Sequence, residues 1–234
     1  MAKRPDLHGE HHRLNRYRSL RAAVLGAMAG LVAVSSLIAG LLAAGMPPAD
    51  VLLTSTVALV AGALALAAGQ HVALQLRRDT EKADLEMEAR ELEINFEHEL
   101  GEMRDIYVHR GVDPETADRV ARQMMAHDAL GAHAREEMGL HQISDTRPLL
   151  SAIPMAISFA AGAALPLLVA LVAPADRMMI LTIPLTLLAL AILGALSSRT
   201  GGASMLSGGF RTALWGAVTM AATALAGQLL TSLG

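Results

Sequence analysis

The fold of this chain is decided by residues 51–105, which read VLLTSTVALV AGALALAAGQ HVALQLRRDT EKADLEMEAR ELEINFEHEL GEMRD. The first part, residues 51–76, has no Asp, Glu, Lys or Arg and exceeds the roughly 20 apolar residues that cross a bilayer as a helix. The second part, residues 79–105, holds 11 of the chain's 22 acidic residues. Residues 77–108 contain no proline and only Gly101 as glycine, so we predict that the membrane helix continues without a break into one acidic helix.

Four other segments are long and apolar enough to span a membrane: residues 22–44, 151–172, 178–197 and 212–232. They carry almost no charge on any face, which argues against a soluble helical bundle. The breaks between them are short and turn-like, and the longest, residues 197–211, contains four glycines. We therefore predict an all-α membrane protein with five transmembrane helices and a three-helix metal-binding domain inserted between spans 2 and 3. The expected divisions are a tail at 1–20, spans 1 and 2 at 21–78, the inserted domain at 79–147, and spans 3 to 5 at 148–234.

The composition excludes several classes of function. The 234-residue chain has no cysteine, which excludes disulfides, zinc–thiolate sites, iron–sulfur clusters and thiol catalysis. Its net charge of −3 and the lack of a basic stripe interleaved with aromatics indicate no nucleic-acid partner. No nucleophile–base arrangement, phosphate-binding loop or dinucleotide fingerprint is present, so we expect neither an enzyme nor a catalytic cofactor.

The distribution of Lys and Arg predicts the orientation in the membrane, because cytoplasmic loops carry an excess of these residues. The N-terminal tail is basic, whereas the loop at 46–50 has no Lys or Arg. Arg77 and Arg78 follow the second span, and Arg199 and Arg211 flank the last break. We therefore expect the N-terminus and the inserted domain in the cytoplasm and the C-terminus outside.

The acidic helix carries its carboxylates in a pattern typical of a metal site. At 100° per residue, four of them fall within about 80° of arc: Glu88, Glu91, Glu99 and Glu102. Glu81 and Asp84 extend the same stripe. A solvated helix face usually alternates charge signs at i and i+4, but this stripe is nearly all acidic and borders an apolar seam. A divalent metal site is therefore a stronger interpretation than a solvated face.

A later part of the inserted domain supplies further candidate ligands. Asp113 and Pro114 are expected to start a second helix, Asp128 to cap a third, and Gly139 to end it. The third helix carries His133, Glu136 and Glu137. A His/Glu pair four residues apart is more often a surface pair than a ligand pair, so its value depends on packing beside the acidic stripe. Oxygen ligands alone suit Fe²⁺, Mn²⁺ or Mg²⁺, and a histidine ligand shifts the preference towards Fe²⁺, Mn²⁺ or Zn²⁺.

Four segments resemble the vacuolar iron transporter family in its bacterial branch: LRAAVLGA at 20–27, RDTEKADL at 78–85, HDALGAHAR at 127–135 and GAALPLL at 162–168. The resemblance implies a five-span homodimer in the bacterial inner membrane that carries Fe²⁺, and often Mn²⁺, out of the cytoplasm in exchange for protons. It also implies that the family's metal-collecting glutamates correspond to Glu88, Glu91, Glu99, Glu102 and Glu137. A methionine of some members corresponds less securely to His133. Small residues in the first span, including Gly26 and Gly30, are expected to assist dimerisation by close helix approach.

The chain departs from the family pattern inside the membrane. Where members usually have Ala-Asn-Asp-Gly in the first span, residues 27–30 read AMAG, and where they have Ser-Met-x-x-Gly-Glu in the second, residues 65–70 read ALAAGQ. The pathway candidates are then Met28, Ala29, Leu66, Gln70 and His71, although His71 is equally consistent with the membrane edge. Two hypotheses remain open. The protein is either an Fe²⁺/Mn²⁺ exporter, or a membrane-anchored metal-buffering or sensing protein that has lost transport.

Overall fold

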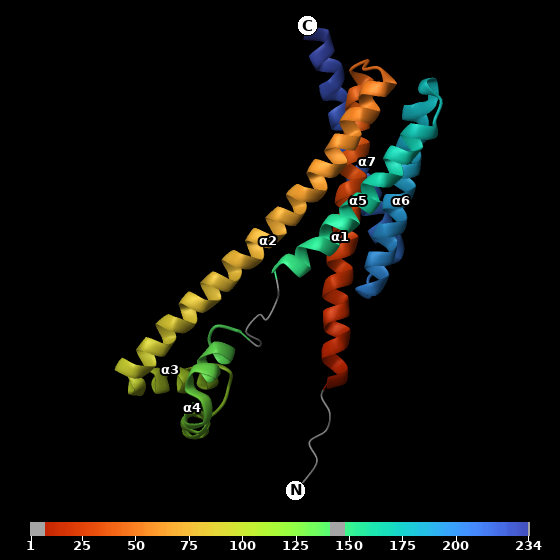
Figure 1. Ribbon diagram of the computed structural model, residues 1–234. Helices are drawn as coiled ribbons and strands as arrows, with labels where there is room; N and C mark the ends of the chain where they lie inside the picture. Colours follow the sequence, from red (N-terminus) through yellow and green to blue (C-terminus); the bar gives the residue numbers. More distant parts are fainter. Residues whose placement is uncertain (1–7, 141–147, 234) are drawn as a thin grey trace. The chain divides into compact units, whose positions relative to one another are not determined.

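The computed structural model describes residues 8–140 and 148–233, and the side chains of residues 23–140 and 152–233. In these ranges every regular element is helical (Figure 1). The elements are α1 (His8–Ala43), α2 (Pro48–Ile94), α3 (Phe96–His109), α4 (Pro114–Glu136), α5 (Pro148–Val172), the short 3₁₀ helix η1 (Ala175–Arg177), α6 (Met178–Thr200) and α7 (Met205–Leu233).

Five of these helices, α1, α2, α5, α6 and α7, are long and apolar enough to cross a membrane, which confirms the predicted number of spans. The 47-residue α2 runs without interruption past Arg77, as its sequence predicts. Helix α1 already begins at His8, inside the segment predicted as a tail. Residues 1–7 of that tail and 141–147 of the inserted domain lie outside the described residues.

The chain forms two compact units, and α2 contributes to both. The membrane unit comprises the residues up to His71 and those from Leu149 onwards. The inserted unit comprises Val72–Pro148 and thus the last part of α2 together with α3 and α4.

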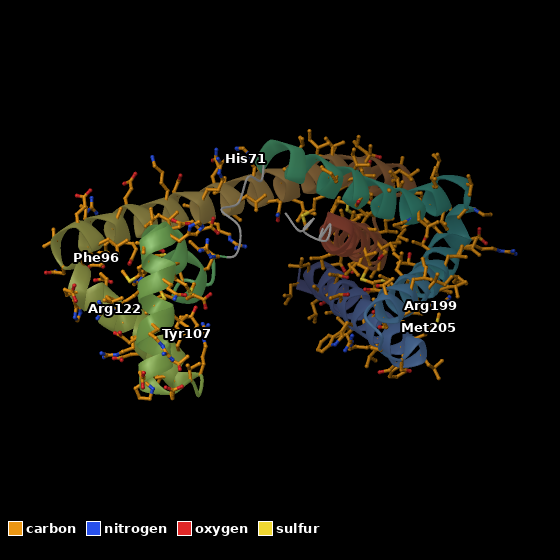
Figure 2. All side chains as sticks on the ribbon, turned by 90° about the horizontal axis from the view of Figure 1, so that it is seen from below. His71, Phe96, Tyr107, Arg122, Arg199 and Met205 are labelled. Atoms are coloured by element: carbon orange, nitrogen blue, oxygen red, sulfur yellow. The ribbon has the colours of Figure 1, made fainter. Side chains whose placement is uncertain are left out.

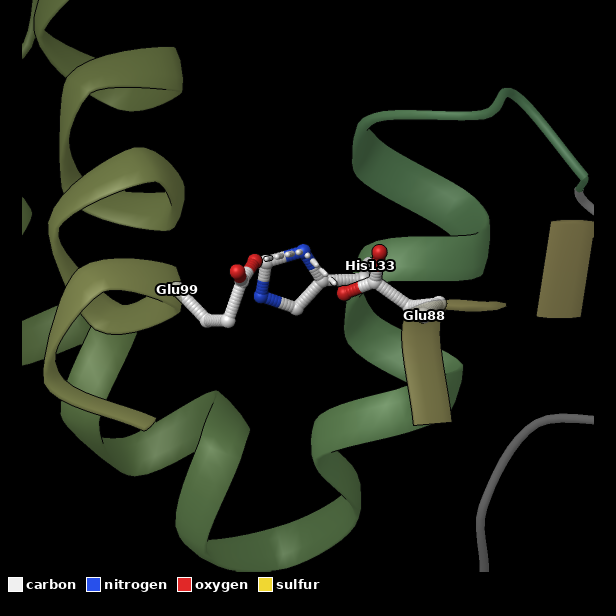
Figure 3. A group of neighbouring side chains, drawn as sticks. All are labelled: Glu88, Glu99 and His133. Atoms are coloured by element: carbon white, nitrogen blue, oxygen red, sulfur yellow. Dashed lines mark ion pairs between the residues drawn. The ribbon is translucent and has the colours of Figure 1, made fainter. Parts of the chain in front are cut away.

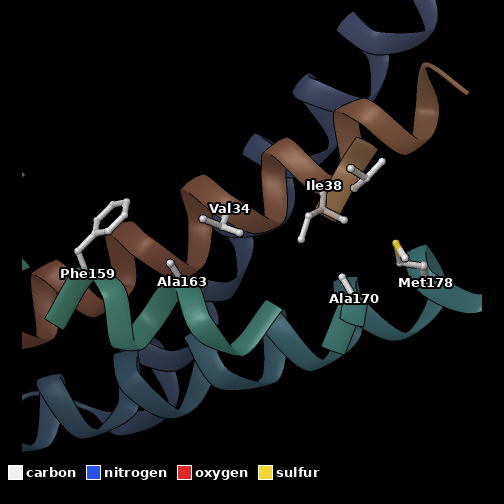
Figure 4. Packing of buried hydrophobic residues seen from close by; sticks show 7 residues of the cluster. Val34, Ile38, Phe159, Ala163, Ala170 and Met178 are labelled. Carbon is white, nitrogen blue, oxygen red and sulfur yellow. The ribbon is translucent and has the colours of Figure 1, made fainter. Parts of the chain in front are cut away.

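A cluster of buried apolar residues holds α1, α2 and α5 together in the membrane unit (Figure 4). Val34 and Ile38 of α1 pack with Phe159 and Ala163 of α5. The backbones approach very closely here, because a Cβ at Gly30 would collide with the carbonyl oxygen of Phe159. Glycine is therefore required where α1 crosses α5.

The same contacts correct the expected role of the small residues in the first span. A Cβ at Gly26 would lie 2.9 Å from the carbonyl oxygen of Met155, so Gly26 and Gly30 both serve packing within one chain. Small side chains predict a close approach of helices but do not specify which helix approaches.

The break expected at 197–211 is much shorter than predicted. Helix α6 continues to Thr200 and α7 begins at Met205, so the turn is limited to residues 201–204. Gly208 and Gly209 lie inside α7 and are buried, and a Cβ at Gly208 would meet Ser198 and the Gly194 carbonyl oxygen of α6. These glycines permit close helix packing instead of forming a turn, and Arg211 consequently lies within a helix.

The inserted unit differs from the prediction at one decisive point. The expected unbroken helix over 77–108 is wrong, because α2 ends at Ile94 and Asn95 adopts φ −132° and ψ 42° before α3 begins. The break allows Leu92 before it and Leu100 and Met103 after it to pack against the same apolar cluster on α4. This packing is a tertiary effect, since no proline or glycine marks the position.

The local signals for the other helix ends are confirmed. The Asp113 side chain accepts a hydrogen bond from the Thr116 N–H at 3.0 Å. Asp128 is non-helical (φ −163°, ψ 84°) and accepts from the Gly131 N–H at 2.9 Å, so α4 consists of two arms joined at this residue. Gly139 follows the second arm with φ +67°, a conformation that favours glycine.

Candidate metal centre

Three ionisable side chains from three helical segments meet inside the inserted unit. Glu88 comes from α2, Glu99 from α3 and His133 from the second arm of α4 (Figure 3). One potential ligand atom from each lies within 4.8 Å of the others. All three residues are buried, with exposed fractions of 3%, 3% and 0%. Burial of two carboxylates with an imidazole is unfavourable unless a positive charge compensates them. In a metal site the bound cation supplies that charge.

The hydrogen bonds of this cluster are incomplete. His133 Nδ1 is 2.9 Å from Glu137 Oε2, 2.9 Å from Glu88 Oε1 and 4.0 Å from Glu99 Oε2. Only the Glu137 contact has hydrogen-bond geometry, so Glu88 Oε1 has no hydrogen-bond partner among the described residues. His133 Nε2 is likewise buried without a partner in that part of the chain. A divalent cation bound between these side chains would satisfy both atoms.

The remaining predicted ligands lie around or outside this buried cluster. Glu137 is partly exposed at its edge, and Glu91 is exposed. Glu102 is near His98 (3.4 Å), and Glu81 pairs with Arg77 (2.7 Å). Glu136 and Asp84 do not belong to the buried cluster. Glu136 forms an ion pair with Arg110, and Asp84 is exposed. Within the described residues, the cluster contains no ligand that the sequence had not already suggested.

Comparison with known proteins identifies the family of this chain. A model of the VIT family matches residues 20–228. The chain belongs to the VIT family.

This VIT family protein is similar over most of its length to curated relatives. It is 43% identical over 222 residues to the "Vacuolar iron transporter" of Acanthamoeba castellanii, which covers 94% of this chain and 82% of the relative. It is 30% identical over 220 residues to "Vacuolar iron transporter 2" of Oryza sativa subsp. japonica, covering 93% and 89% of the two chains. The relatives indicate a metal transporter embedded in a membrane.

The intramembrane candidates of this VIT family protein do not gather at one site. Ala29 and Leu66 both pack against the apolar cluster of the membrane unit. Met28 instead lines a cavity with residues of α6 and α7. Gln70 and His71 are half-buried, and His71 Nδ1 is a buried atom without a hydrogen-bond partner among the described residues.

Burial also controls the protonation of the cluster. Desolvation is the largest cause that raises the pKa of Glu88, the charge of His133 opposes it, and the nearby carboxylates of Glu137, Glu99 and Glu91 raise it further. The pKa of Glu99 is raised by burial and then by the charge of Glu102. Without a cation, these carboxylates therefore hold protons at a higher pH than ordinary glutamates.

The raised pKa values predict that metal binding is sensitive to mildly acidic pH. Metal binds the deprotonated carboxylates, so protons compete with it as the pH falls towards the raised pKa values. We expect the affinity for Mn²⁺, measured by calorimetric titration of the purified protein, to fall by on the order of tenfold or more between about pH 7.5 and pH 5.5. An affinity that is equal at both values would contradict this assignment of the ligands.

Proposed function

We propose that this protein exports Fe²⁺ or Mn²⁺ from the cytoplasm and that Glu88, Glu99 and His133 capture the ion before it enters the membrane unit. The observation that carries the proposal is the buried cluster of two carboxylates and one imidazole with two buried polar atoms lacking partners. Membership of a transporter family supplies the membrane step, and the relatives' name supports iron as a substrate.

The donor set favours particular ions. Two carboxylates with an imidazole suit Fe²⁺, Mn²⁺ or Zn²⁺ better than Mg²⁺ or Ca²⁺, which prefer oxygen ligands alone. Glu137 contacts His133 Nδ1 and would orient the imidazole, which would offer one ring nitrogen to the metal beside Glu88 and Glu99. Glu91 and Glu102 would draw cations towards the cluster through their charge, while Glu81, Asp84 and Glu136 have no direct part in this proposal.

The proposed orientation and assembly rest on sequence. The basic N-terminal tail, together with Arg77 and Arg78 at the start of the inserted unit, favours a cytoplasmic position for both, with the C-terminus outside. On this basis the inserted unit is a cytoplasmic three-helix domain, and the membrane is a bacterial inner membrane. The homodimer is proposed from the family alone, because apolar side chains exposed on a membrane helix, such as Leu53, Val57 and Leu64 of α2, can also face lipid.

A second candidate function is favoured by the membrane unit itself. Ala29 and Leu66 lie against an apolar cluster where family members usually offer an aspartate and a methionine, and such a path offers a cation few ligands. The protein would then be a membrane-anchored metal-buffering or sensing protein.

Measurement of Mn²⁺ and Fe²⁺ uptake into proteoliposomes, with the inserted unit on the outside, decides between a transporter and an anchored metal-binding protein. Uptake above protein-free liposomes supports transport, whereas metal binding without uptake supports the anchored binder.

Restoration of the usual carboxylates gives a further prediction. We expect Ala29→Asp together with Gln70→Glu to raise the initial uptake rate severalfold, because carboxylates inside the membrane lower the cost of dehydrating the cation. The matched control is Ala29→Asn with Gln70 unchanged, which adds a side chain of similar size without charge. Equal rates for the two variants would show that carboxylates at these positions do not limit the flux.

A further inference from the structure

An open cavity of about 290 Å³ in the membrane unit is separate from the metal cluster and from the apolar cluster between α1 and α5. Its lining comes from three helices: Met28 and Val32 of α1, Leu190 of α6, and Arg211, Thr212 and Trp215 of α7. The cavity thus combines an apolar wall with one permanent positive charge. This combination is typical of a site for an amphiphile with an anionic head.

The charge of Arg211 is not balanced by the surrounding helices. No ion pair or hydrogen bond of its guanidinium is found among the described residues, and the sequence has no Asp or Glu after Asp176. Residues 23–43 of α1 also lack acidic side chains. Across the short turn, Arg199 adds a second positive charge at the same end of the α6–α7 hairpin, near Met205 (Figure 2). The described side chains of these three helices therefore offer no carboxylate to Arg211, and an anion from the surrounding bilayer can pair with it.

The position of Trp215 indicates where this cavity lies in the bilayer. Trp215 follows Arg211 by four residues and so occupies the same face of α7. Tryptophan and arginine both favour the headgroup region of a bilayer, where an indole can meet lipid and a guanidinium can meet phosphate. The apolar residues Met28, Val32 and Leu190 then extend from this region towards the hydrocarbon core. We propose that the cavity binds an anionic phospholipid, with its phosphate on Arg211 and an acyl chain along the apolar wall.

The proposal has a direct test because Trp215 is the only tryptophan of the chain. The full-length protein is reconstituted with phosphatidylglycerol or phosphatidylcholine brominated on the acyl chains, and quenching of the Trp215 fluorescence reports lipid at the cavity. We expect phosphatidylglycerol to bind with on the order of fivefold preference over phosphatidylcholine, the effect of about one interfacial cation. Arg211→Gln should reduce this preference to about one, and Arg211→Lys should keep most of it.

The matched control is Arg199→Gln, which removes the same charge from the same hairpin end but from a residue that does not line the cavity. It should retain the preference of the unmodified protein. The proposal is overturned if the unmodified protein does not discriminate between the two lipids, if Arg211→Gln keeps the preference, or if Arg199→Gln loses as much as Arg211→Gln. The last result would indicate a general interfacial charge effect. If a variant fails to fold, equal quenching of the unmodified protein by the two lipids still overturns the proposal.

Discussion

Replacement of both Glu88 and Glu99 by glutamine is expected to lower the affinity of the protein for Mn²⁺ by at least on the order of 100-fold. Glutamine keeps nearly the same size, so the apolar packing of α2 and α3 on α4 should remain, while both negative charges at His133 are lost. Binding is measured by calorimetric titration at about pH 7.5. The same variant should lose most metal uptake into proteoliposomes if capture by this cluster precedes transport.

A matched control separates this effect from the general negative charge of the acidic segment. Glu86 and Glu93 are exposed residues of α2, and neither belongs to the buried cluster. The double change Glu86→Gln and Glu93→Gln removes two charges from α2 and should change the affinity by less than about threefold, because exposed charges are screened by salt. If both double variants lost affinity equally, the ion would be held by a diffuse acidic surface and the capture site proposed above would be wrong.

Substitution of Gly30 by leucine is expected to destabilise the membrane unit strongly. The atoms nearest to an added Cβ belong to the backbone of Phe159 and Ala163, which cannot move aside as a flexible side chain would. Forced separation of α1 from α5 should cost about 3 kcal/mol. The midpoint of thermal unfolding, followed by size-exclusion chromatography of the heated protein in detergent, should then fall by roughly 6–12 °C.

Gly69 provides the control for this substitution. It also lies in a predicted span, on α2, but no atom is within 4 Å of an added Cβ and the residue is exposed. Gly69→Leu should therefore shift the midpoint by no more than a few degrees. A similar loss for the two variants would mean that leucine at a glycine position, and not the contact between α1 and α5, causes the destabilisation.

The sequence determined those features that depend on local chemistry or on the bilayer. The five spans follow from the length of uncharged segments, since a bilayer imposes nearly the same requirement on every chain. The start of α4 at Asp113 and its kink at Asp128 follow from side chains that accept hydrogen bonds from the next turn. The spacing on an ideal helix predicts Glu88 and Glu99 as ligands, whereas His133 is a candidate whose part depends on packing beside them.

The tertiary structure decided how these parts meet. An ideal helix placed Glu88 and Glu99 in one straight stripe, but the break at Asn95 puts them on different helices that both face His133. The break carries no proline or glycine, and it brings Leu92 and Leu100 onto one apolar cluster. In the same way, Gly208 is a packing residue of α7 because α6 lies against it, although glycine more often marks a turn. Local sequence patterns describe the preferences of a segment, whereas these outcomes depend on which distant segment packs against it, and only the folded chain contains that information.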